Sequence, residues 1–163
     1  MDIAIVRTVA RMAGAAALAV MITAGATALP GLAHSVKFSA GEPGDPKKPS
    51  RTIEIAMREE YGLQEFVPDK IVVKLGEQIR FVLRNRGKND HEFVLATEKE
   101  NLKHAAEMRK HPDMEHDDPN ALRLKPAKSG ELIWKFTKRG TFEFSCLIPG
   151  HREDGMIGTV VVK

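Results

Sequence analysis

Apolar and polar residues alternate along most of the chain from Arg51 onward, in short runs separated by glycine and proline. A period of two residues is typical of a β-strand with one buried face. The clearest run is QIRFVLRN, in which Ile79, Phe81 and Leu83 fall on one face. Strands are predicted over residues 52–57, 70–76, 78–85, 91–96, 131–136, 141–146 and 156–163. Short strands at this spacing predict an all-β sandwich or barrel.

One segment in the middle of the chain breaks this pattern. Residues 98–111, EKENLKHAAEMRKH, are rich in helix formers and hold neither glycine nor proline. They predict a helical insertion, followed by a long loop that leads back into the strands.

The first 33 residues differ from the rest. Two arginines precede an apolar run from Met12 to Ala28, and small residues follow. This order is typical of a secretory signal peptide, with cleavage after residue 28 or 33. The alternative is a membrane anchor, for which a run of this length is short. The predicted organisation is a signal peptide over 1–33, a flexible arm over 34–50 and one domain over 51–163, with no stable membrane insertion after cleavage.

Composition narrows the class of protein. The chain is 42% hydrophobic and 29% charged, with a net charge of +3, which suits an ordinary globular domain. Its basic residues are scattered among acids, so no nucleic-acid partner is expected.

The chemistry is concentrated near the end of the chain, in SCLIPGHREDGMIG. Cys146 is the single cysteine, although exported proteins usually pair their cysteines. It must therefore be buried, be bonded to a second chain or be held by a metal. His151 and Met156 follow at intervals of five residues, and His91 opens an upstream strand. A thiolate, two imidazoles and a weak axial thioether are the ligands of a blue-copper site. Zinc also accepts cysteine and histidine, but the methionine favours copper.

The pattern FxFSCxIPGHxxxGMxGxxVVK resembles the C-terminal copper loop of the cupredoxins, among them plastocyanins, azurins and rusticyanins. The resemblance covers residues 51–163. It implies a Greek-key sandwich of about eight strands, one type 1 copper ion, and His91, Cys146, His151 and Met156 as its ligands. Two positions depart from azurins. Glu92 replaces an asparagine and Asp90 replaces a glycine, which could tilt the site from a blue towards a green form.

Three functions follow from this resemblance. The first is a periplasmic electron carrier with a redox partner protein. The second is a copper-tolerance protein, because the chain also resembles exported cupredoxins linked to copper tolerance. The third, a piece of a copper enzyme, is disfavoured because such enzymes commonly use His-x-His pairs and the sequence has none.

Other histidines and methionines are candidates for a second copper site. They are His34, His104, Met108, His111, Met114 and His116. His104, Met108 and His111 have helical spacing, and His34 would become the N-terminus after cleavage at residue 33. The alternative for the helix is a polar surface with ordinary histidines.

Overall fold

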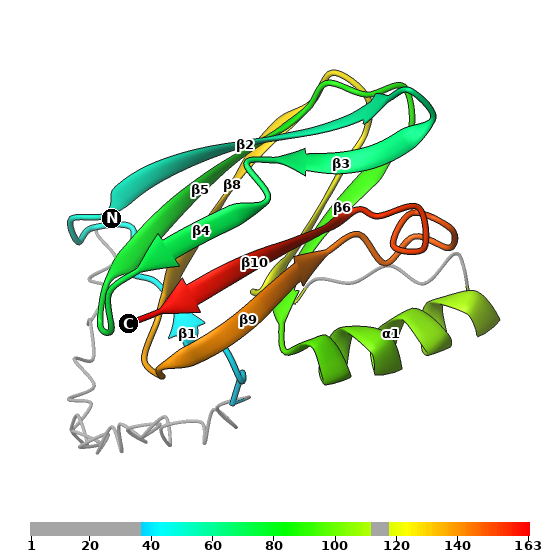
Figure 1. Cartoon of the computed structure of the whole chain (residues 1–163). Coiled ribbons are helices and arrows are strands. Elements are labelled where there is room, and N and C mark those ends of the chain that lie inside the picture. Colours follow the sequence, from blue (N-terminus) through cyan, green and yellow to red (C-terminus); the bar gives the residue numbers. More distant parts are fainter. Residues whose placement is uncertain (1–36, 112–117) are drawn as a thin grey trace, which may run out of the picture. The chain divides into compact units, whose positions relative to one another are not determined.

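Two five-stranded β-sheets pack face to face, with one helix beside the second sheet (Figure 1). The computed structural model describes residues 37–111 and 118–163. The first sheet has the strand order β1 (Glu42–Pro43), β8 (Ser129–Lys135), β5 (Gln78–Asn85), β2 (Arg51–Glu60) and β3 (Leu63–Val67). The second has the order β4 (Lys70–Val73), β10 (Ile157–Val162), β9 (Gly140–Ser145), β6 (His91–Ala96) and β7 (Ala121–Leu124). The predicted all-β sandwich with a helical insertion is confirmed.

The alternating pattern of the sequence is explained by the burial of one face of each sheet. In β5, every second residue is buried, among them Ile79, Phe81 and Leu83. Aromatic rings join the two sheets: Phe66 of β3 meets Phe144 of β9 edge-on, with centroids 5.1 Å apart. Burial of such side chains supplies most of the stabilisation of a small sandwich.

Helix α1 (Glu98–Lys110) confirms the predicted insertion. The side chain of Thr97 caps the first turn by accepting a hydrogen bond from the N–H of Glu100, and the carboxylate of Glu100 accepts one from the N–H of Thr97. Such reciprocal capping satisfies two amide groups that have no partner within the helix. Asn101, Ala105 and Met108 are the buried residues of the helix. The insertion is thus anchored against the sheet instead of projecting from it (Figure 1).

The segment predicted as a flexible arm, residues 34–50, is described from residue 37 onward and makes specific contacts with the sandwich there. Ala40 is fully buried, and its carbonyl accepts a hydrogen bond from the Trp134 indole at 3.2 Å. The two residues of β1 pair with β8, and Asp45 donates its N–H to Gln78 at 2.8 Å. Glycine and proline bend this segment without preventing it from covering the edge of the first sheet.

Some strands were not predicted from the sequence, and some predictions concern residues that the structure does not describe. Strand β7 lies in the segment that was predicted as a long loop, and β3 lies between two of the predicted strands. The predicted signal peptide lies outside the described residues, as do its cleavage positions. Within the two described ranges, no helix has both the length and the apolar character needed to cross a bilayer.

Candidate metal centre

Antiparallel pairing brings His91 and Cys146 to the same end of the second sheet. Strand β6 begins at His91, β9 ends at Ser145, and the two strands pair with Val94 opposite Ser145. Cys146 follows directly, and the loop that it opens runs to β10. Side chains 55 positions apart in the sequence therefore meet at one pole of the sandwich.

One nitrogen of each histidine and the sulfur of Cys146 form a compact cluster. The ligand atoms of His91, Cys146 and His151 all lie within 4.8 Å of one another. Sγ of Cys146 is 3.3 Å from Nδ1 of His151, and the two imidazole centroids are 5.2 Å apart. His91 and Cys146 are fully buried, whereas His151 is partly exposed. Three donors at this separation can converge on a single metal ion.

Met156 is fully buried at the other end of the same loop. Its carbonyl accepts a hydrogen bond from the Cys146 N–H at 3.1 Å, and its own N–H bonds to the His151 carbonyl at 3.0 Å. Gly155 supplies the φ of +99° that this tight loop requires just before Met156. The backbone thus holds the predicted axial residue next to the other two loop residues. The role of all four residues as ligands stays a prediction.

The sulfur of Cys146 is held from the side of β6 as well. The backbone N–H of Glu92 donates a hydrogen bond to Sγ at 3.3 Å. Because the donor is a backbone group, the replacement of asparagine by Glu92 leaves this contact intact. Such a bond stabilises a thiolate and ties the two ligand-bearing segments together.

Burial keeps the cluster uncharged in the absence of metal. It raises the pKa of the Cys146 thiol to about 12, and backbone hydrogen bonds offset part of this effect. Burial lowers the pKa of His91, against the opposing effect of the Glu59 carboxylate. Burial, followed by the charge of His91, lowers the pKa of His151. At neutral pH the two neutral imidazoles can therefore bind a metal without losing a proton, whereas the thiol of Cys146 must lose its proton to do so.

Copper binding is expected to release about one proton per ion near pH 7, because Cys146 must bind as a thiolate. The apparent affinity should accordingly rise by about tenfold per pH unit below the thiol pKa. Calorimetric titration with copper in two buffers of different ionisation enthalpy measures the proton count. The Cys146→Ser variant is the control and should release none; equal release from both proteins would contradict the assignment of the thiol.

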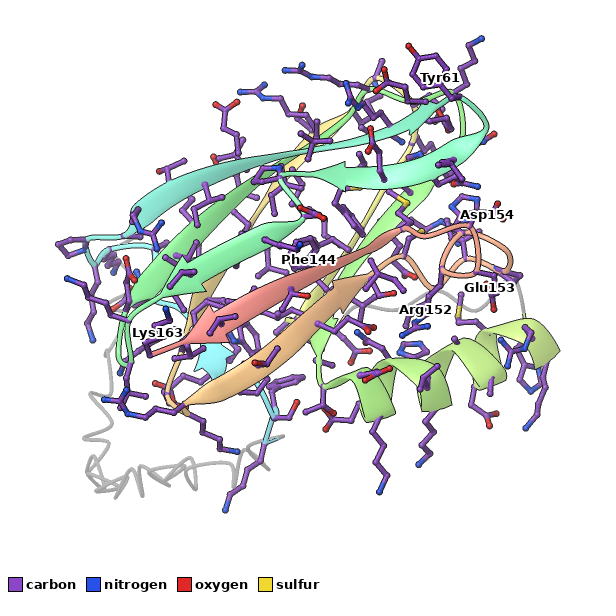
Figure 2. All side chains as sticks on the ribbon, viewed as in Figure 1. Tyr61, Phe144, Arg152, Glu153, Asp154 and Lys163 are labelled. Atoms are coloured by element: carbon purple, nitrogen blue, oxygen red, sulfur yellow. The ribbon has the colours of Figure 1, made fainter. Side chains whose placement is uncertain are left out.

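A buried polar network fixes the loop to its surroundings. Arg152, the neighbour of His151, donates to Glu143 of β9 at 2.8 Å, and both side chains are mostly buried. Glu143 also accepts from Asn101 of α1 at 3.1 Å. On the surface, Arg109 of α1 pairs with Glu153 at 3.2 Å, and Figure 2 shows Arg152 and Glu153 on the loop beside the helix. The helical insertion thus braces the ligand-bearing loop.

Comparisons with known proteins agree with this geometry. A profile of the family described as copper binding proteins, plastocyanin/azurin family, matches residues 53–163. The chain belongs to the plastocyanin/azurin family of copper-binding proteins.

Three relatives share the name copper-resistant cuproprotein CopI. The one from Rubrivivax gelatinosus is 49% identical over 131 residues, covering 80% of this chain and 78% of the relative. The one from Pseudomonas aeruginosa is 34% identical, covering 94% and 97% of the two chains. Among solved structures, the reduced auracyanin of Roseiflexus castenholzii has a TM-score of 0.59 at 23% identity, covering 70% of this chain and 98% of its own. This last likeness shows the shared cupredoxin fold.

Copper is the cofactor of this cupredoxin, and the donor set suits it. Nδ1 of His91 is buried and has no hydrogen-bond partner among the described residues, as expected of an atom that faces a metal. Cys146 has no disulfide partner, since it is the single cysteine of the chain. Soft sulfur together with imidazole nitrogen is the combination that copper prefers.

The second predicted group of histidines and methionines is only partly described. Met108 is fully buried in a cluster with Val94, Ala105 and Leu147, so it does not share an exposed face with His111. His104 is half-buried. His34, Met114 and His116 lie outside the described residues. The helix places Met108 inside because its buried positions, Asn101, Ala105 and Met108, are themselves one turn apart.

Proposed function

We propose that the chain is an exported type 1 copper protein that cycles between Cu(I) and Cu(II) and transfers single electrons. Its ligands would be His91, Cys146, His151 and Met156. The observation that carries this proposal is the convergence of two imidazoles on an unpaired, buried cysteine within 4.8 Å. A single ion in that position supplies one-electron chemistry at a site that needs no other cofactor.

The protein would contribute rigidity and controlled access. His91 and Cys146 lie in regular strands or directly beside them, and the loop to Met156 is closed by backbone hydrogen bonds. Such a site changes little when the charge of the ion changes, which favours fast electron exchange. Burial of three of the four residues keeps water out. Partly exposed His151 gives a redox partner protein a short route to the ion.

A role in copper tolerance is the second candidate, and it uses the same site. It is favoured by the three relatives named as copper-resistant cuproproteins, of which one shares 49% identity over 131 residues with this chain. Here the protein would bind, oxidise or hand on copper in the periplasm. Both roles describe a binding and redox protein instead of an enzyme, with no nucleic-acid partner.

Deletion of the gene separates the two roles. If the protein supports copper tolerance, the deletion strain should grow more slowly than the parent on medium with added copper, and at the same rate without it. Expression of the intact protein should restore growth, whereas the Cys146→Ser variant should not. Equal growth of the parent and the deletion strain at every copper concentration would leave electron transfer as the function.

A further inference from the structure

The carboxylate of Glu59 contacts His91, one of the proposed ligands, through the ring nitrogen Nε2. Glu59, near the end of β2 in the first sheet, places Oε1 3.1 Å from Nε2 of His91. The His91 side chain is fully buried and that of Glu59 is 23% exposed. The contact therefore joins the two sheets at the metal end of the sandwich, on the side of the imidazole away from Nδ1.

The loop before His91 is built around this carboxylate. The N–H of Lys88 donates to Oε2 at 2.8 Å, and the N–H of Asn89 donates to Oε1 at 3.0 Å. Gly87 makes room, because a Cβ at that position would lie 2.3 Å from Oε2. Two backbone donors of this loop, together with Nε2 of His91 at the start of β6, thus surround a side chain that comes from another strand. These directed hydrogen bonds hold the Glu59 carboxylate in one position, unlike an exposed ion pair, which usually contributes little to stability.

The pairing of β2 with β5 explains how Glu59 reaches that loop. The two strands are parallel, with Met57 opposite Asn85, and the N–H of Arg86 bonds to the Met57 carbonyl at 2.8 Å. The end of β2 therefore runs alongside the loop that leads from β5 to His91. Burial opposes ionisation of Glu59, but the two backbone N–H groups and His91 outweigh it and lower its pKa. The group is a carboxylate at neutral pH.

We propose that Glu59 is a positioning residue for the copper ion, which it influences through His91. By accepting a hydrogen bond from Nε2, the carboxylate selects the imidazole tautomer in which Nδ1 carries the lone pair. Its negative charge also makes the imidazole a stronger donor, which stabilises Cu(II) relative to Cu(I) and lowers the reduction potential. This inference rests on the proposed type 1 site.

The test is the Glu59→Gln variant, compared with Glu60→Gln. Both variants remove one carboxylate from neighbouring residues, but Glu60 pairs with Arg58 at the surface and lies outside the His91 loop. In Glu59→Gln, the ratio of Cu(II) to Cu(I) affinity should fall by about tenfold, which raises the reduction potential by about 59 mV. Glu60→Gln should keep the potential of the unmodified protein. Equal potentials for the two variants would overturn the proposal.

Glu59→Asp is the alternative test variant if Glu59→Gln fails to fold. It keeps the charge but withdraws the carboxylate from Nε2, so the potential should again rise; an unchanged potential would overturn the proposal.

A second readout requires no copper. Nitrogen chemical shifts of His91 in the metal-free protein should show Nε2 protonated and Nδ1 unprotonated, with a larger share of the other tautomer in Glu59→Gln. The opposite tautomer in the unmodified protein would overturn the proposal. Failure of the proposed function itself has a different signature, because the unmodified protein would then lack the copper–thiolate absorption while the His91 tautomer could still be measured.

Discussion

Replacing Cys146 with serine is expected to abolish the intense visible absorption of the copper-loaded protein. That absorption arises from charge transfer between a thiolate sulfur and Cu(II), and Cys146 is the single cysteine of the chain. A serine hydroxyl has nearly the same size but is a hard donor that stays protonated at neutral pH, so it cannot replace the thiolate. The two histidines still meet in this variant, so it should retain weak copper binding with a pale colour. Absorption spectra taken at equal copper content measure the loss.

His111→Ala is the matched control. This histidine is exposed at the end of α1 and lies outside the cluster of ligand atoms. Its variant should keep the full colour, and any change in copper count there would report on a second site instead. If Cys146→Ser kept the colour of the unmodified protein, the assignment of the thiolate would be wrong.

Replacing Phe144 with alanine is expected to lower the free energy of unfolding by about 3–5 kcal/mol. Phe144, which Figure 2 labels, is fully buried between the sheets. Its ring stacks on that of Phe93, with ring centroids 5.1 Å apart. Phe66 meets the same ring edge-on. Truncation removes these contacts and leaves a cavity that strands β9 and β10 can fill only in part. Because a domain of this size is stable by about 5–15 kcal/mol, the variant would lose a substantial share of its stability.

Tyr61→Ala provides the control for aromatic truncation. Tyr61 is 96% exposed at the tip of the β2–β3 hairpin, where Figure 2 labels it. Its loss should change stability by less than about 0.5 kcal/mol. Denaturant unfolding of the metal-free proteins compares the two variants without a contribution from copper. Similar midpoints for both would contradict the role of Phe144 in the core.

Most strands could be predicted from the sequence, whereas β1, β3 and β7 could not. β5 alternates over eight residues, and its predicted bounds agree with the structure. β7 has four residues, ALRL, which is too short to show a period. β3 follows a turn in which Tyr61 and Gly62 both have positive φ, so the hairpin depends on backbone geometry that the residue pattern does not reveal. β1 exists only through its pairing with β8.

The residues of the candidate site were predictable because their chemical types are rare and regularly spaced. The structure brings His91, Cys146 and His151 together, with Met156 buried beside them. Glu59 was not predictable, because it is one of many glutamates, and only the parallel pairing of β2 with β5 brings it to His91. Gly87, three residues before Asp90, is a weak indication of this contact in the sequence, since a glycine can mark a close approach by another group.

The optical and electron paramagnetic resonance spectra of the intact protein, loaded with copper and freed of excess metal, test the central claim most directly. The account predicts about one copper per chain, a strong sulfur-to-copper charge-transfer absorption and a signal with the small copper hyperfine splitting of a thiolate-bound ion. Weak absorption together with the large splitting of an ordinary tetragonal Cu(II) site would contradict it.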